Sequence, residues 1–291
     1  MSATPGPPAA FAVPIRRDVV VVEGPDAAAY LQGQLAQDVL GIEIGGWAWS
    51  LLLQPQGKIE AWVRVHRASE LRYELDVEES FGAAIVLRLQ RFLIRTDATI
   101  SEATRLMTAV RGCRIGEADE HAVDPAPICW PGVEGFDAVG SGPEGIAAGT
   151  VDDLERVRVS AGVPAMGSEL TFDVIPAEVG SWFVDASVSF TKGCYVGQEL
   201  VARVDSRGSR TPRNLRVIAL GDGATGASPG VELREPDGRV VGVITSVAGG
   251  SALAYVHRTV EAPADLLVRV GDADRPVTVL ADDVTPREDA P

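Results

Sequence analysis

The sequence predicts an α+β region followed by an all-β region, and three observations support this fold class. First, the segments of the first hundred residues follow the order β-α-β-β-β-α, which is typical of helices packed on an antiparallel or mixed sheet. Second, from Pro212 onward only short apolar strands separated by Gly, Pro and Asp turns remain. Third, 291 residues are more than one compact core usually holds. We expect a boundary near Arg210.

The first two elements are a strand and a helix. Asp18–Glu23 (DVVVVE) is a β-branched run and predicts a buried strand. Gly24-Pro25-Asp26 then predicts a helix start, because proline is favoured at the first helical position and an acid in the first turn. We expect that helix to cover AAAYLQGQLAQDV.

Next come a hairpin, a strand and a second helix. WAWSLLLQ and KIEAWVRV flank Pro55-Gln56-Gly57, a short Gly-containing turn that predicts a β-hairpin. LRYELDV predicts a strand, and SFGAAIVLRLQRFLI has the apolar spacing of a helix. The Gly/Ala-rich stretch from Gly140 to Gly149 predicts a loop. Thr150 with Asp153 predicts a capped helix that continues through Arg158.

The C-terminal stretch predicts strands only. LRVIAL, VELRE, RVVGVITSV and ALAYVH are short apolar runs, and Pro236-Asp237-Gly238 is a turn between two of them. Residues 1–10 and 285–291 have the composition of disordered tails.

Composition excludes several classes of function. A formal charge of −15 disfavours nucleic acid and anionic membranes as partners, since phosphate binding needs the opposite field. The sequence has no apolar run of membrane-spanning length, and the N-terminus lacks the pattern of a signal peptide. The three cysteines and three histidines have no metal-ligand spacing, so we predict no metal site. A reducing compartment, the cytoplasm, is expected.

Thr191–Arg203 (TKGCYVGQELVAR) is the segment richest in possible chemistry. Cys194 lies between two glycines, beside Lys192 and before a predicted helix, and both neighbours would lower the pKa of its thiol. A free cysteine is more commonly a small buried hydrophobe. The residues alone therefore leave both interpretations open. Lys58 and Lys192 are the only lysines in an arginine-rich sequence, which draws attention to both.

This segment resembles the K-G-C-Y-x-G-Q-E motif of the YgfZ/GcvT-like folate-binding protein family. Four other stretches are similar to further segments of that family and occur in the same order. They are Tyr30–Leu35 (YLQGQL) with the following Asp38-Val39, the hairpin turn at Leu53–Lys58, RVSAGVP from Arg158, and Pro176–Glu178. The resemblance implies a GcvT-like fold. Two intertwined α/β subdomains at 11–209 would surround a central folate cavity, and 210–284 would form a C-terminal β-barrel.

The resemblance also implies a function and a set of site residues. It implies a protein that binds tetrahydrofolate, or a one-carbon derivative, and assists assembly or repair of iron–sulfur enzymes. Partners would be folate and iron–sulfur enzymes or cluster-assembly proteins. Cys194 and Lys192 would carry the thiol chemistry. The folate-contacting residues would be Asp137 in a Gly-Phe-Asp segment as pterin anchor, Arg158 at the carboxylate end, and Tyr195, Gln198, Glu199 and Arg203. Asp137 could equally be an ordinary turn residue, and Arg158 a surface charge.

Two alternatives on the same fold remain open. A glycine-cleavage T-protein-like aminomethyltransferase would need an aspartate after the hairpin turn, where this sequence has Ala61. The adjacent Glu60 would point to the other side of the strand. We therefore expect no classical aminomethyl transfer, although a one-residue shift of the hairpin would change this. The other alternative is a non-catalytic scaffold that holds a partner enzyme.

Overall fold

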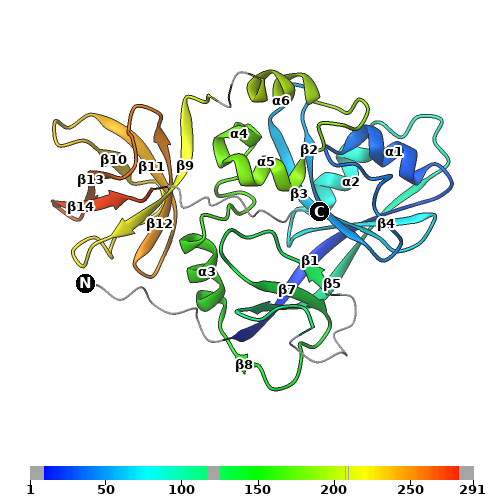
Figure 1. Cartoon of the computed structure of the whole chain (residues 1–291), viewed down its shortest axis with the longest axis horizontal. Helices are drawn as coiled ribbons and strands as arrows, with labels where there is room; N and C mark the ends of the chain where they lie inside the picture. The colour runs from blue at the N-terminus through cyan, green and yellow to red at the C-terminus, as the bar shows by residue number, and fades with distance from the viewer. Residues whose placement is uncertain (1–9, 117–124, 207, 209, 282–291) are drawn as a thin grey trace.

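Two long strands organise the first part of the computed structural model, which describes residues 10–116, 125–206, 208 and 210–281. β1 (Phe11–Glu23) and β5 (Thr99–Arg111) pair antiparallel along their whole lengths at the middle of an eight-stranded sheet (Figure 1). The run Val19–Val22 is buried, which confirms the predicted strand. The strand begins at Phe11 rather than at Asp18, because the more polar residues 11–17 also pair with β5.

The other strands extend this sheet on both sides. The order is β2-β3-β4-β1-β5-β7-β6, and β8 pairs with β1. The strands are β2 (Trp47–Leu53), β3 (Ile59–Arg67), β4 (Arg72–Glu78), β6 (Ala126–Pro127), β7 (Gly135–Val139) and β8 (Ala147–Ala148). β2 and β3 form the predicted hairpin, and β4 is the predicted third strand.

The helices near the N-terminus are shorter than predicted. α1 (Ala27–Gln34) ends because Leu35 is extended and forms a bridge with Leu52 of β2. α2 (Gly82–Gln90) ends at Arg91, so the apolar residues that follow it are not helical. At α1, pairing with the sheet overrides the apolar spacing.

The remaining helices lie between the sheet and the C-terminal barrel (Figure 1). α3 (Val151–Ser160) begins with the predicted capping box, in which Thr150 and Asp153 exchange hydrogen bonds. α4 (Pro176–Val179), α5 (Ser181–Ser187) and α6 (Gln198–Asp205) follow.

The C-terminal strands close into a six-stranded barrel, as the resemblance implied. Its strands are β9 (Arg213–Leu220), β10 (Glu232–Arg234), β11 (Val240–Ala248), β12 (Ser251–His257), β13 (Ala264–Val270) and β14 (Ala273–Val279). Closure leaves no unpaired sheet edge. The predicted boundary at 210 precedes β9, and the predicted tails lie almost wholly outside the described residues.

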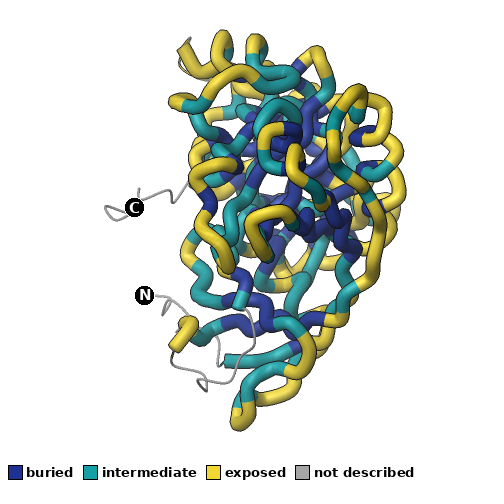
Figure 2. The backbone as a smooth tube through the Cα atoms, turned by 90° about the vertical axis from the view of Figure 1, so that its right-hand side faces the viewer, coloured by how far each residue is buried: buried dark blue, intermediate teal, exposed yellow. Residues whose placement is uncertain are grey.

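The barrel has a core of its own and also packs on the first part. Ile218 and Val268 belong to the barrel's core, whereas Leu215, Leu253 and Tyr255 pack into the large core of the sheet and helices. Figure 2 shows the buried backbone running through the centre of the molecule. Among the described residues, no helix combines the length and apolarity that crossing a bilayer requires.

A buried carboxylate joins the barrel to α3. Glu169, fully buried after α3, accepts hydrogen bonds from Ser246 Oγ of β11 at 2.6 Å and from Arg158 Nη1 at 3.2 Å. Its backbone carbonyl accepts from the Tyr255 hydroxyl of β12 at 3.1 Å. An unpaired buried charge is costly, so removing either Glu169 or Arg158 would leave the other charge without a buried partner.

We expect Glu169→Ala to lower the free energy of unfolding by about 3–5 kcal/mol, because Arg158 and Ser246 would lose a buried partner. Glu155→Ala is the matched control. It removes the more exposed carboxylate from the same arginine and should cost about 1 kcal/mol or less. Urea unfolding of both variants measures the difference, and equal losses would contradict this account.

Candidate functional site

A cavity of about 310 Å³ lies where the sheet meets α3 and the segment that follows it. Known small-molecule sites begin at roughly this volume, ~300 Å³. Its walls come from β1, β2, β3, β4, β5 and β7 of the sheet, from the segments before β7 and after α3, and from α3 itself. The lining residues are Ile15, Arg16, Arg17, Trp49, Trp62, Glu78, Glu79, Arg111, Ile128, Trp130, Asp137, Leu154, Glu155, Arg158, Val163, Pro164 and Ala165.

Three tryptophans line the cavity: Trp49, Trp62 and Trp130. Trp49 and Trp62 stack with ring centroids 4.1 Å apart, and Trp62 Nε1 donates to Ser187 Oγ at 2.9 Å. Trp130 lies under the Arg111 guanidinium at 4.3 Å. Surfaces of this kind suit a planar ring, since aromatic faces gain by stacking.

A chain of buried ion pairs crosses the sheet beside the cavity. Arg64 of β3 is fully buried and pairs with Asp76 of β4 at 3.2 Å and with Asp137 of β7 at 2.8 Å. Arg17 of β1 pairs with Asp76 at 2.6 Å, and Arg111 of β5 with Asp137 at 2.9 Å. Three arginines thus share two aspartates, which leaves one excess positive charge.

Asp137 therefore lies in the cavity wall with both carboxylate oxygens in ion pairs. Burial alone would raise the pKa of Asp137, but the Arg111, Arg64 and Arg17 charges lower it to about 2. The carboxylate is ionised at neutral pH and already bound to arginine. The sequence predicts Asp137 as pterin anchor. The structure places Asp137 at the cavity, but both of its carboxylate oxygens already accept hydrogen bonds from arginines.

Arg158 also lines the cavity, and it is buried rather than a surface charge. Its Nε and Nη2 donate to Glu155, Nη1 to Val163 O and Glu169, and Nη2 also to Ser246 Oγ. An arginine has five N–H donors, and acceptors are available for all of them. A ligand carboxylate would have to displace the half-exposed Glu155 to reach Arg158.

The predicted motif forms a loop that a lysine attaches to α1. Lys192 Nζ donates to the backbone carbonyls of Gln32 at 2.6 Å, Leu35 at 2.7 Å and Gln37 at 3.0 Å. These carbonyls lie at the C-terminal end of α1, where a positive charge is favoured. Burial lowers the pKa of Lys192 to about 8. The side chain thus connects two segments that are similar to family motifs, YLQGQL and KGCYVGQE.

Two glycines let the motif loop meet the β2–β3 hairpin turn. Gly197 has φ +83°, and a Cβ there would lie 2.5 Å from Gln54 O. Gly57 has φ +76°, and a Cβ there would lie 2.6 Å from Leu200 Cβ. Both positions need glycine for conformation and for space.

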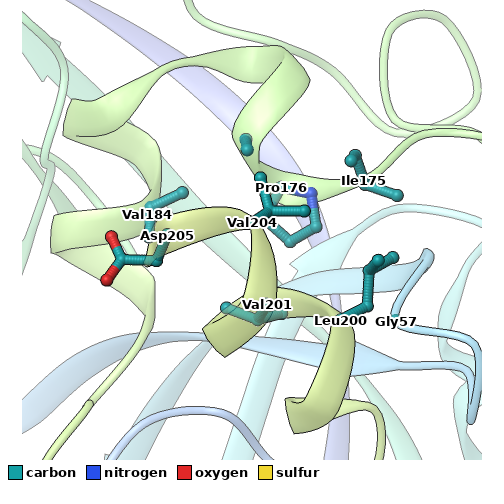
Figure 3. A pocket seen from close by; sticks show the side chains of 9 residues that line it. Gly57, Ile175, Pro176, Val184, Leu200, Val201, Val204 and Asp205 are labelled. Carbon is teal, nitrogen blue, oxygen red and sulfur yellow. The ribbon is translucent and has the colours of Figure 1, made fainter. Parts of the chain in front are cut away.

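α6 continues the motif and packs on α4 and α5. Figure 3 shows Leu200, Val201 and Val204 of α6 facing Ile175 and Pro176. The gap between them holds only about 10 Å³, near the volume one water needs. This contact is packing rather than a ligand site.

The other predicted motif residues lie on this loop and helix. Burial raises the pKa of the half-buried Tyr195 to about 12, and Gln198 Oε1 accepts from Tyr195 N at 3.1 Å. Glu199 and Arg203 are exposed in the first and last turns of α6. None of the four lines the 310 Å³ cavity.

Cys194 is exposed at the tip of the loop, so the buried-hydrophobe interpretation is wrong. It is also not among the residues that line the cavity. By contrast, burial raises the pKa of the Cys129 thiol to about 12 and keeps it protonated. The predicted residues thus fall into two places: Asp137 and Arg158 at the cavity, and the motif residues on the α1–α6 side.

Sequence reasoning missed most of the cavity wall. Trp49 and Trp62 were noted only as strand residues, and Arg17, Glu78 and Arg111 were not singled out. A signal was available in the hairpin strands, WAWSLLL and EAWVRV, which contain tryptophan and arginine. Strands buried on both faces are usually aliphatic, so these residue types indicate something other than plain core packing.

Comparison with known proteins gives homologues along most of the chain, although no family model matches it. The tRNA-modifying protein YgfZ of Edwardsiella ictaluri is 25% identical over 87% of this chain and 86% of its own length. The iron–sulfur cluster assembly factor IBA57 of Mus musculus is 28% identical, over 85% and 77%. The glycine cleavage system aminomethyltransferase T of Bartonella henselae has the same fold, with TM-score 0.76 and 18% identity, over 94% of this chain and 86% of that one.

The two lysines allow a direct test of the loop attachment. We expect Lys192→Met to lower the free energy of unfolding by about 1.5–3 kcal/mol, because three carbonyls lose a charged donor. Lys58→Met is the control. It removes an exposed ion pair with Asp173 and should cost about 1 kcal/mol or less. Thermal unfolding of both variants checks this, and a larger loss for Lys58→Met would contradict it.

The lowered pKa of Asp137 predicts an acid-sensitive contribution to stability. The folded pKa is about 2, below the ordinary 3.8, so the unfolded state binds the proton more readily. The contribution is complete above pH 4 and is lost as the pH falls toward 2. Asp137→Asn should therefore be less stable than the wild type at pH 6, with a difference that narrows between pH 4 and pH 2. Urea midpoints across this range measure it, and a constant difference would refute the assignment.

Proposed function

We propose, from its homology to the YgfZ and IBA57 proteins, that this chain binds tetrahydrofolate, or a one-carbon derivative, and assists assembly or repair of iron–sulfur enzymes. The observation that carries the folate part is the cavity walled by Trp49, Trp62 and Trp130. Cys194 would supply the thiol chemistry on the exposed motif loop.

The cavity residues fit a pterin. Its ring is flat and apolar on both faces, which matches the tryptophan walls, and its edges carry ring nitrogens and an oxo group that accept hydrogen bonds. Two buried donors of cavity residues, Trp49 Nε1 and Arg111 Nε, have no hydrogen-bond partner within the described part of the chain. Buried donors are rarely left unpaired, so these two support a ligand with acceptors. Bound tetrahydrofolate would supply a carrier for one-carbon units on its N5 and N10 nitrogens.

The thiol acts together with a partner in this proposal. An iron–sulfur cluster takes about four protein ligands, and Cys194 supplies one. In the ranges that the structure describes, no group of three or more His, Cys, Asp or Glu side chains is arranged to hold a metal ion. The cluster would be cargo, shared at Cys194 with thiols of a client enzyme or an assembly protein. Lys192 and Gly197 would keep the thiol presented outward by fixing the loop on α1 and on the hairpin.

Two observations weigh against aminomethyl transfer. Ala61, at the position where that chemistry would need an aspartate, is fully buried in the core. The adjacent Glu60 pairs with Arg88 of α2 at 2.9 Å, and neither residue lines the cavity. A methyl group cannot orient the folate amine or balance a developing charge.

The charge of the chain argues for an indirect link to tRNA. One homologue is named a tRNA-modifying protein, but a formal charge of −15 disfavours contact with a polyanion. We therefore place the connection in client iron–sulfur enzymes. Three cysteines without disulfides are consistent with work in a reducing compartment, the cytoplasm.

Calorimetric titration with tetrahydrofolate tests the folate part, run in parallel on Cys194→Ala. We expect both proteins to bind with similar affinity, because Cys194 is not among the cavity-lining residues. Binding without turnover of the folate would favour the assisting role over an enzyme. An absence of binding by the intact protein would remove folate from the function and leave a scaffold on this fold.

Restoration of an iron–sulfur enzyme's activity in cells that lack this protein tests the thiol part. We expect Cys194→Ser to restore much less activity than the wild type, because a serine cannot ligate a cluster or exchange thiols. Cys129→Ala should restore normal activity, since that thiol is buried and protonated. Full restoration by Cys194→Ser would exclude a chemical role for the thiol.

A further inference from the structure

The cavity contains a second carboxylate whose situation differs from that of Asp137. Glu78, the last residue of β4, lines the cavity and accepts one hydrogen bond, from Met166 N to Oε1 at 3.1 Å. Among the described residues, no arginine, lysine or histidine nitrogen forms an ion pair with it. Its carboxylate therefore keeps capacity to accept further hydrogen bonds.

The charges around Glu78 are committed elsewhere. Arg17 pairs with Asp76, and Arg158 with Glu155 and Glu169. Burial raises the pKa of Glu78, and the nearby charge of Glu155 adds to this, while Arg17 and Arg158 oppose it. A partly buried carboxylate that faces a cavity without its own cation is a costly arrangement for a residue with a purely structural role.

The other acids of the cavity are less available. Both oxygens of Asp137 are held by arginines, and Glu155 receives Nε and Nη2 of Arg158. Glu79 is exposed and pairs with Arg16 at 2.9 Å. Glu78 is thus the lining carboxylate best able to accept from a bound molecule.

We propose, building on the proposed function, that Glu78 rather than Asp137 accepts the paired N–H donors of the bound pterin. The donors are the ring N–H and the 2-amino group of its aminopyrimidinone edge, which lie side by side and match one carboxylate. The residue thereby selects planar, uncharged heterocycles with adjacent donors on one edge. Anionic rings would be repelled by the same carboxylate.

Titration calorimetry of tetrahydrofolate with Glu78→Gln tests the proposal, with Glu23→Gln as the control at an exposed carboxylate that does not line the cavity. We expect Glu78→Gln to weaken binding about 10- to 100-fold, the effect of losing hydrogen bonds to a charged acceptor. Glu23→Gln should stay within about threefold, because it changes only an exposed ion pair with Arg72. Wild-type affinity in Glu78→Gln would overturn the proposal.

An analogue of tetrahydrofolate without the 2-amino group provides the second measurement and needs no variant to fold. The wild type should bind it about 10-fold or more weaker than tetrahydrofolate, and Glu78→Gln should hardly distinguish the two, because both changes remove the same hydrogen bond. Equal affinities of the wild type for both ligands would refute the proposal. Failure of the wild type to bind tetrahydrofolate would instead refute the proposed function itself.

Discussion

The ion pairs that cross the sheet are the constraint on which the rest of the structure depends. Five adjacent strands each contribute one residue to this network, in the order β3 (Arg64), β4 (Asp76), β1 (Arg17), β5 (Arg111) and β7 (Asp137). In addition, Arg64 pairs with Asp137 across the strands between them. A buried charge without its partner costs several kcal/mol, so each strand must keep the register that pairs it. Arg17, Arg111 and Asp137 of this network also line the cavity. Sheet register and cavity shape are therefore set by the same contacts.

Local patterns were the part of the fold that the sequence could predict well. The capping box at Thr150 and Asp153 involves residues three apart, and the β2–β3 hairpin joins two apolar strands through a short turn that contains Gly57. The end of α1 was predicted too late because its cause is distant. Leu35 leaves α1 to pair with Leu52, and no pattern within the helix announces that. The GcvT-like architecture came from resemblance, and the fold comparison supports it.

The site was predictable only in part, for the same reason. Arg64 lies in β3, which is buried on both faces, and its completely enclosed side chain has its partners on β4 and β7. The backbone carbonyls that accept from Lys192 lie more than 150 residues earlier in the sequence. The motif alone therefore could not predict that this lysine caps the C-terminal end of α1. The tryptophan walls arise where separate strands meet.

The contact of Gly57 with Gly197 has a consequence for how this protein can vary. A side chain at either position would collide with the segment that carries the other, and both backbones have a conformation that other residues avoid. The hairpin turn and the cysteine loop are 140 positions apart, yet a Cβ at Gly197 would meet Gln54 O of the turn, and a Cβ at Gly57 would meet Leu200 of α6. The presentation of the exposed thiol therefore depends on the absence of a side chain at two positions, one of which lies in a turn far away in the sequence.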